Sequence, residues 1–239
     1  MTERAHYVND PHIWAEQVAE QFVNPPEERQ NAGLLIADIC GTLVDADYGF
    51  HQYYTQAAAN AGYEPGAIAT IDTFRAEGHR AHLGHATITS DYDALKNQLM
   101  HDSELHAAMP PMANSIELAE RGARHGLPNG YLSTRPDAIG EATYQNLKSH
   151  GFADAPMLLR SEGTRYAHTV SYKVDSLAVL RAELDARRLD DLSIVFVDDF
   201  SQLVESVNQS GIDRLVGVHF DADTSWAAIA RAHLGIEHF

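Results

Sequence analysis

The stretch Gly33-Leu34-Leu35-Ile36-Ala37-Asp38-Ile39-Cys40-Gly41-Thr42 is the starting point for predicting the fold. Its first five residues form a short, uninterrupted apolar run, which is typical of a β-strand buried on both faces. The run ends at the carboxylate of Asp38, and a tight turn around Gly41 follows. A buried strand that ends in an acidic residue predicts a sheet with a polar site at the carboxyl ends of its strands.

Similar apolar runs recur along the chain, and helical patterns separate them. We expect further strands at residues 130–132, 156–159, 193–197 and 214–218, and helices at 113–125, 137–150, 174–187, 201–209 and 224–233. Regular alternation of strands and helices indicates a doubly wound, mostly parallel α/β sheet that is covered by helices on both faces.

One interval breaks this alternation. Residues 47–111 contain no run typical of a buried strand, but they do contain helical patterns at 50–61, 71–77 and 91–105. We therefore predict a helical cap at residues 46–112, inserted into a core domain formed by residues 33–45 and 113–239. Residues 1–32 are polar and resemble an N-terminal extension, with one amphipathic helix at about 11–22.

Composition excludes several classes of function. The 239 residues include 17 Lys or Arg and 34 Asp or Glu, which gives a net charge of −17. A nucleic-acid partner is not expected, because such binding depends on clustered positive charge. No apolar run reaches the roughly 20 residues that a membrane-spanning helix needs. The first residues lack the pattern of a signal peptide, and Cys40 is the sole cysteine, so we expect a cytoplasmic protein. We also expect a monomer or a homodimer.

Polar and charged side chains follow several of the predicted strands. The segment Tyr131-Leu132-Ser133-Thr134-Arg135-Pro136 places hydroxyl groups and a guanidinium group at one strand end, just before a helix. Lys173 precedes a second helix, and the carboxylates of Asp198 and Asp199 follow the strand at 193–197. Two adjacent carboxylates repel each other, so hydration or a cation must compensate them.

Together these features resemble the haloacid dehalogenase (HAD) superfamily over residues 33–218. That superfamily has an Asp-x-Asp-Gly-Thr-like loop after the first strand, a Ser or Thr after the second, a Lys or Arg before a later helix, and an acidic pair after the fourth strand. Here the four motifs occur in that order at Asp38–Thr42, Ser133, Lys173 and Asp198-Asp199. The resemblance implies a Rossmann-like core with a helical C1-type cap.

The resemblance also implies a Mg²⁺-dependent phosphohydrolase that acts on a small phosphorylated molecule. Asp38 would attack the phosphoryl group and form an aspartyl phosphate. The implied metal ligands are the carboxylates of Asp38 and Asp199 and the main-chain carbonyl of Cys40, with Asp198 supporting either the metal or Lys173. Ser133 would hold a phosphoryl oxygen and Lys173 would balance the negative charge. Gly41, Thr42, Thr134 and Arg135 are candidate substrate contacts, and Arg135 could equally form a salt bridge within the core.

Cys40 departs from the pattern of the superfamily's phosphatases, which have a second Asp at this position as the general acid and base. A thiol is mostly protonated at neutral pH, but it is a poor hydrogen-bond partner and a weak base toward oxygen. Two further interpretations therefore stay open: a hydrolase that cleaves a carbon–halogen or carbon–phosphorus bond, and a degenerate member that binds without turnover. Cap lysines form a Schiff base in phosphonate-cleaving relatives. Lys96 is the lysine within the predicted cap, but it lies farther along the chain than this role requires, and a surface lysine of the helix at 91–105 is the favoured interpretation.

Two more clusters are candidates for function. His79, His82 and His85 recur at every third residue, which fans them over a helix surface too widely for three ligands to one metal ion. An aromatic cluster at the start of the cap could form the core of the cap or line a substrate pocket; it comprises Tyr48, Phe50, His51, Tyr53 and Tyr54.

Overall fold

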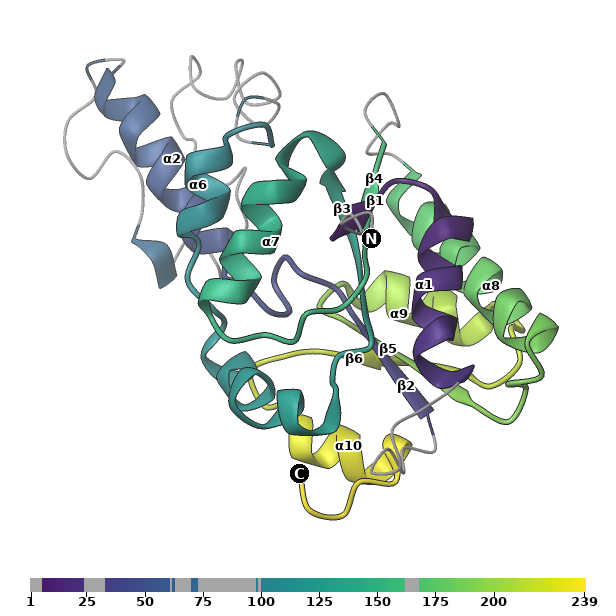
Figure 1. The fold of residues 1–239 in the computed structure, drawn as a ribbon. Helices are drawn as coiled ribbons and strands as arrows, with labels where there is room; N and C mark the ends of the chain where they lie inside the picture. Colours follow the sequence, from purple (N-terminus) through teal and green to yellow (C-terminus); the bar gives the residue numbers. More distant parts are fainter. Residues whose placement is uncertain are drawn as a thin grey trace.

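The computed structural model describes residues 6–23, 33–60, 62, 70–72, 98, 100–161 and 168–239. Within these residues, six parallel strands form one sheet with the order β1-β4-β3-β2-β5-β6 (Figure 1). The strands are β1 (Tyr7–Val8), β2 (Gly33–Ala37), β3 (Gly130–Pro136), β4 (Met157–Arg160), β5 (Ser193–Asp198) and β6 (Leu215–His219). The predicted doubly wound α/β fold is confirmed, and each of the five strands expected from apolar runs is present.

The strand β2 lies at the point where the direction in which successive strands are added to the sheet reverses. From β2 the chain runs outward through β3 and β4 on one side, and later through β5 and β6 on the other. The pairing of β2 with β5 extends from Gly33 opposite Ser193 to Ala37 opposite Val197. In open α/β sheets, ligands bind at the carboxyl ends of the strands beside such a switch point. Asp38 therefore stands where this topology places a ligand site.

Helices cover both faces of the sheet, and alternate strand residues contact the two layers. Leu34 and Ile36 pack with α1 (Pro11–Val23), α8 (Thr169–Ala186) and α9 (Ser201–Gln209). Leu35 and Ala37 pack on the other face with α7 (Gly140–Ser149) and α10 (Trp226–Leu234). Short helical segments precede β3 at Ala113–Ser115, Leu118–Gly122 and Ala123–His125, and Asp137–Ile139 leads into α7. This period-two alternation explains why β2 is apolar throughout.

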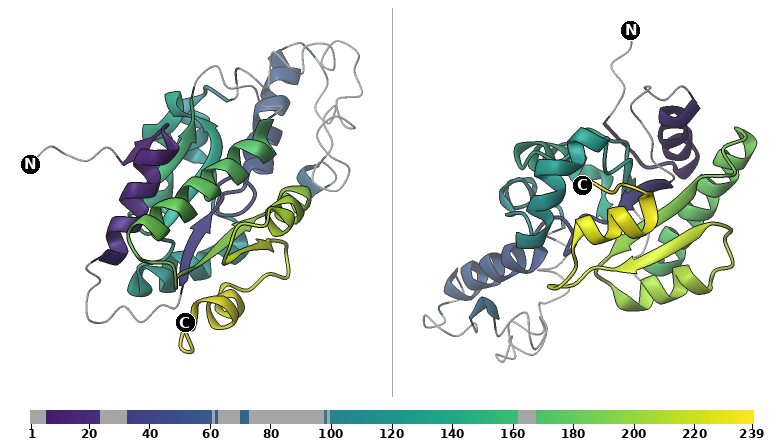
Figure 2. Two further views of the ribbon diagram at one scale, coloured as in Figure 1. Left: turned by 90° about the vertical axis from the view of Figure 1, so that its right-hand side faces the viewer. Right: turned by 90° about the horizontal axis from the view of Figure 1, so that it is seen from below.

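The N-terminal residues differ from the expected extension. Tyr7 and Val8 pair with β4 at the edge of the sheet. The helix α1 lies alongside α8 (Figures 1 and 2). Trp14 and Val18 of α1 are completely buried in the core. Residues 7–23 are therefore part of the core domain, because the apolar face of α1 covers one side of the sheet. The polar residues 24–32, which suggested a boundary, lie outside the described residues.

Two described helices, α2 (Ala46–Asn60) and α6 (Ser103–Ala108), pack against each other outside the sheet, within the segment where a cap is predicted (Figure 1). The chain leaves and re-enters the core at one place. Val44 bridges Pro111 in antiparallel fashion, Asp45 N–H donates to the Pro110 carbonyl, and Met112 N–H donates to the Leu43 carbonyl.

A segment that is inserted into a domain needs its two ends to lie close together, and these contacts hold them so. The extent of the cap as a separate domain stays a prediction, since residues 61, 63–69, 73–97 and 99 lie outside the described part. The helix predicted at 91–105 is not continuous to its end: α6 begins at Ser103, where the side chain of Asp102 accepts a hydrogen bond from Leu105 N–H and caps the helix.

Candidate active site

A cavity of about 560 Å³ opens at the carboxyl ends of β2 and β5. The sequence-predicted residues Asp38, Cys40, Gly41, Thr134, Lys173, Asp198 and Asp199 all line it. They come from the loops after β2 and β5, from the end of β3 and from α8, which are distant in sequence. The parallel sheet brings them together because it ends all these strands at one edge.

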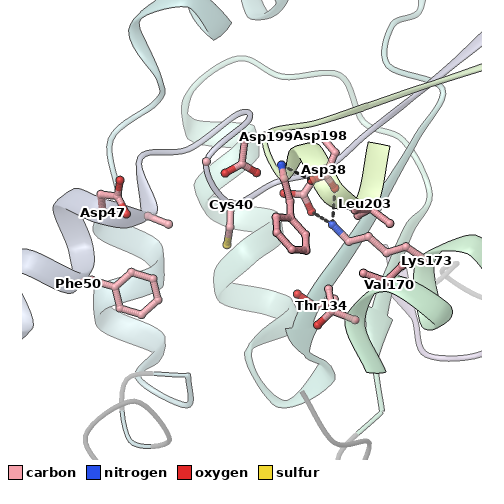
Figure 3. A pocket seen from close by; sticks show the side chains of 14 residues that line it. Asp38, Cys40, Asp47, Phe50, Thr134, Val170, Lys173, Asp198, Asp199 and Leu203 are labelled. Atoms are coloured by element: carbon pink, nitrogen blue, oxygen red, sulfur yellow. Dashed lines mark hydrogen bonds and ion pairs between the residues drawn. The ribbon is translucent and has the colours of Figure 1, made fainter. Parts of the chain in front are cut away.

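Lys173 joins two of the carboxylates in the floor of this cavity (Figure 3). Its Nζ donates to Oδ1 of Asp38 at 2.5 Å and to Oδ2 of Asp198 at 2.7 Å. All three residues are at most 4% exposed. Lys173 is therefore a buried, paired lysine in the first turns of α8, which begins earlier than the sequence indicated, and is not a solvated residue at a helix start.

The two carboxylates raise the proton affinity of this lysine. Burial alone would lower the pKa of Lys173, but the charges of Asp198 and Asp38 outweigh burial and raise that pKa above its usual range. Asp198 also accepts a hydrogen bond at Oδ1 from Phe200 N–H at 2.8 Å. Because both oxygens of Asp198 are engaged, this residue holds Lys173 in place beside Asp38.

Asp38, Asp198 and Asp199 form a compact cluster of carboxylates. One oxygen from each lies within 4.8 Å of the others. Burial raises the pKa of Asp38 to about 7, with Asp198 and Asp199 adding to this shift and Lys173 opposing it. Loss of hydration in the cavity, together with the charge of Asp198, raises the pKa of Asp199 to about 6. Hard oxygen donors this close together fit a divalent cation such as Mg²⁺, whose charge would offset their repulsion.

Gly41 allows Asp199 to approach the loop after β2. Its φ is +81°, and a Cβ atom there would lie 2.2 Å from Oδ2 of Asp199. The loop is closed by Gly41 N–H donating to the Val44 carbonyl and by Val44 N–H donating to the Ile39 carbonyl. Only glycine combines this backbone conformation with this close contact. Gly41 therefore sets the position of Asp38 relative to Asp199.

Arg135 contacts Cys40 inside the protein. Its Nε donates to Cys40 Sγ at 2.9 Å, while its terminal nitrogens approach Thr143 Oγ1 and Met109 Sδ, each at 3.2 Å. Arg135 is only 1% exposed and is not among the residues that line the cavity. The sequence left two roles open for Arg135, a substrate contact or a salt bridge within the core. Arg135 forms no salt bridge with any described acid, and its guanidinium group contacts the thiol of Cys40 instead.

Two other predicted substrate contacts also lie away from the cavity surface. Ser133 is buried, its Oγ accepts a hydrogen bond from Arg135 N–H at 3.3 Å, and the neighbouring Thr134 lines the cavity instead. Thr42 is fully buried, and its hydroxyl finds no hydrogen-bond partner among the described residues. Roles for Ser133 and Thr42 in holding the phosphoryl group stay predictions.

Sequence reasoning missed several residues of the cavity wall. Asp47 and Phe50 reach it from α2 and Val170 from α8, while Leu203 lies in α9 and Phe200 directly precedes that helix. Phe50 belongs to the aromatic cluster noted in the sequence, and it is the member that lines the cavity. The hydrophobic periodicity and the composition of the sequence gave no signal for the other wall residues, because a wall formed by three helices depends on how those helices pack.

The remaining members of that cluster differ in exposure: Tyr54 is fully buried, whereas Tyr48 is 41% exposed. His79, His82, His85 and Lys96 lie outside the described residues. None of the described helices is both long and apolar enough to cross a membrane.

The sheet order, the segment inserted between β2 and β3 and the placing of Asp38, Lys173, Asp198 and Asp199 around one cavity agree with the HAD-type fold that the sequence resembles. Comparison with solved structures supports this fold. A hydrolase from Streptococcus pneumoniae TIGR4 superimposes with a TM-score of 0.54 at 15% identity, covering 82% of this chain and 95% of that one. A HAD-superfamily hydrolase of subfamily IA, variant 1, from Geobacter sulfurreducens PCA gives 0.52 at 14% identity, covering 83% and 92%.

The similarity is one of fold, since the identities are low. No family model and no curated protein matches the sequence. The chain therefore shares the fold of these two hydrolase structures, and the chemistry of its site depends on its own residues.

Proposed function

We propose that the protein is a Mg²⁺-dependent phosphohydrolase that cleaves a small phosphomonoester through an aspartyl phosphate on Asp38. One observation carries the proposal: Asp38 is held by Lys173 within a cluster of three carboxylates at the floor of an open cavity. A buried carboxylate fixed on one side by a cation is oriented for attack by its other oxygen. The fold comparison adds that such architecture serves hydrolases.

The metal would be held by Asp38 and Asp199, with the main-chain carbonyl of Cys40 as a further ligand. Asp198 is less suited, because its two oxygens are already bonded to Lys173 and to Phe200 N–H. When bound, Mg²⁺ would neutralise the charge that the phosphoryl group brings to the carboxylates.

The residues themselves account for the two displacements. An oxygen of Asp38 forms a bond to phosphorus while the bond to the leaving oxygen breaks, and the leaving oxygen takes a proton from solvent water. Water then forms a bond to phosphorus as the Asp38–phosphorus bond breaks, which releases inorganic phosphate and restores Asp38. Lys173 holds Asp38 in place through both steps and offsets negative charge near the phosphoryl oxygens.

A panel of phosphomonoesters, phosphonates and 2-haloacids, assayed with and without Mg²⁺, tests this function. We expect Mg²⁺-dependent release of phosphate from monoesters and none from Asp38→Asn, whose amide is not a nucleophile. A mass increase of one phosphoryl group on the quenched wild-type protein, absent from Asp38→Asn, would identify the intermediate.

Because Cys40 stands where the phosphatases of the superfamily have a second Asp, two other results of this assay would indicate a different function. Halide release without Mg²⁺ would assign the site to a dehalogenase. Binding of inorganic phosphate without turnover of any compound would instead indicate a degenerate, non-catalytic protein.

A further inference from the structure

Arg135 is a buried arginine that contacts the loop carrying the candidate nucleophile Asp38. Its Nε donates to Sγ of Cys40, which lines the cavity, whereas Arg135 itself does not line it. Because the guanidinium group does not reach the cavity surface, it can influence the reaction only through the residues that it holds. Cys40 is the residue of the nucleophile loop that it holds.

The guanidinium group is itself fixed by two other parts of the fold. Nη1 donates to Oγ1 of Thr143 in α7, and Nη2 approaches Sδ of Met109, on the chain that returns from the predicted cap. Thr143 and Met109 are at most 1% exposed, so close packing keeps both partners in place. The main-chain N–H of Arg135 also donates to Oγ of Ser133. Arg135 therefore offers Cys40 a rigid point of attachment.

The main chain of Cys40 lacks such an attachment within its own loop. The loop is closed by hydrogen bonds from Gly41 N–H to the Val44 carbonyl and from Val44 N–H to the Ile39 carbonyl, and neither bond involves the peptide groups of Cys40. Within the described part of the chain, the carbonyl of Cys40 accepts no hydrogen bond. This carbonyl is thus available to a cation, and the bond from Arg135 to the side chain limits how far the residue can move.

From these contacts, and resting on the proposed Mg²⁺-dependent function, we infer that Arg135 is a positioning residue. It acts through the side chain of Cys40 and keeps the carbonyl of that residue where it can bind Mg²⁺ together with Asp38 and Asp199. Residue 40 thereby has two separate tasks, since its carbonyl serves the metal and its side chain serves Arg135. Removing a group that holds a metal ligand commonly weakens metal binding by about 10- to 100-fold.

Hydrogen exchange of the metal-free protein tests this anchoring without metal or substrate. The Gly41 amide, which donates to the Val44 carbonyl, reports opening of the loop. We expect its exchange to be about tenfold faster in Arg135→Met and in Cys40→Ala, because each loses a hydrogen bond from a charged donor. Cys40→Ser, whose hydroxyl still accepts from Arg135, should exchange more slowly than Cys40→Ala. This pair decides the point even if Arg135→Met does not fold.

Arg181→Met is the matched control. Arg181 is also buried, but its terminal nitrogens donate to the carbonyls of Leu192 and Leu189 beyond the end of α8, and it does not line the cavity. We expect the exchange of the Gly41 amide in this variant to equal that of wild type.

Calorimetric titration with Mg²⁺ measures the consequence for the metal. We expect about tenfold weaker binding in Arg135→Met and in Cys40→Ala, and the same tenfold in the double variant, because both changes remove one contact. With phenyl phosphate as substrate, Arg135→Met should need more Mg²⁺ for its half-maximal rate. Its KM for the ester at saturating Mg²⁺ should stay close to that of wild type.

Three results would overturn the inference and leave the phosphohydrolase in place. The first is wild-type exchange of the Gly41 amide in Cys40→Ala, or equally faster exchange in Arg181→Met. The second is Mg²⁺ affinity that is unchanged in the single variants, or about a hundredfold weaker in the double variant, as independent effects would give. The third is a raised KM for phenyl phosphate in Arg135→Met at saturating Mg²⁺, which would make Arg135 a substrate-binding residue.

Failure of the proposed function gives a different result. If the wild-type protein binds no Mg²⁺, or if Asp38→Asn retains activity, the proposed function falls, and the positioning role that rests on it falls as well.

Discussion

The Nε–H of Arg135 donates to Sγ of Cys40 over 2.9 Å, so that a buried cation lies against the residue two positions after the candidate nucleophile. The other partners of the guanidinium are a hydroxyl and a thioether, and no described acid pairs with it. The strand end of β3 and the loop after β2 are thereby linked by a positive charge that has no carboxylate partner in the described part of the chain. This arrangement suggests that a carboxylate at position 40 would be accommodated.

Cys40→Asp is the first test. A carboxyl group there could protonate a leaving oxygen and activate water, and general acid–base help is worth about 10²–10⁴ in rate. We expect turnover of benzyl phosphate to rise by about a hundredfold and that of phenyl phosphate to change little. The measurement is kcat/KM for both esters. An unchanged ratio would show that protonation of the leaving group does not depend on this position.

Arg135→Met addresses the energetic cost of the buried guanidinium. Replacing a buried charge by an apolar group of similar length often leaves stability unchanged or higher. We expect the free energy of unfolding to stay within about 1 kcal/mol of wild type, whereas Arg135→Ala should cost about 3 kcal/mol because it leaves a cavity. Urea denaturation measures both. A severe loss in the Met variant would mean that the contacts with Cys40 and Thr143 are strongly stabilising.

Lys173→Met should destabilise the metal-free protein. Removal of this cation leaves Asp38 and Asp198 buried without a positive partner, which typically costs about 3–5 kcal/mol. Part of the loss should be recovered at lower pH, where Asp38 is protonated. Denaturation at two pH values checks this, with Lys148→Met, a lysine of α7 outside the cavity, as the control. Equal losses in both variants would contradict the pairing.

Magnesium should stabilise the protein more at high pH than at low pH. Burial raises the pKa of Asp38 from 3.8 to about 7, so the carboxylate form is disfavoured in the folded metal-free protein. The contribution of this group to stability is therefore present at low pH and lost as the pH rises through 7. Mg²⁺ binds the charged form, and its binding should weaken as Asp38 takes up a proton.

We thus expect a larger rise in melting temperature on adding Mg²⁺ at about pH 8 than at about pH 5.5, and almost no rise in Asp199→Ala at either pH. Thermal unfolding followed by circular dichroism gives these values. A Mg²⁺ effect in Asp199→Ala equal to that in wild type would remove the basis for the metal site.

Trp14→Ala tests whether the N-terminal helix belongs to the core. Trp14 is completely buried, and its Nε1 donates to the Pro156 carbonyl. Truncating a buried aromatic side chain costs about 3–5 kcal/mol. Ile13→Ala, at a neighbouring position that is 46% exposed, should cost much less. Similar small losses in both variants would show that α1 is only loosely attached.

The local pattern of the sequence was sufficient for the sheet. Runs such as the one from Gly33 to Ala37 are apolar at every position, which is typical of a strand that is buried on both faces. Ordered motifs also identified Asp38, Lys173 and Asp199 as neighbours, because parallel strands end at a common edge. These predictions depend on short stretches of chain, and the sequence carries them directly.

Tertiary structure alone decided the features that depend on packing between distant elements. The sequence could not show that Trp14 lies in the core, since a polar segment between α1 and β2 resembles a domain boundary. It also left both roles of Arg135 open, and the contact with Cys40 arises because β3 ends beside the loop after β2. The wall formed by Phe50, Val170 and Leu203 joins three helices, and no local sequence pattern shows how far apart those helices lie. The sequence specifies the chemistry of each side chain. Which side chains become neighbours, and so form a site, depends on how the sheet and the helices pack together.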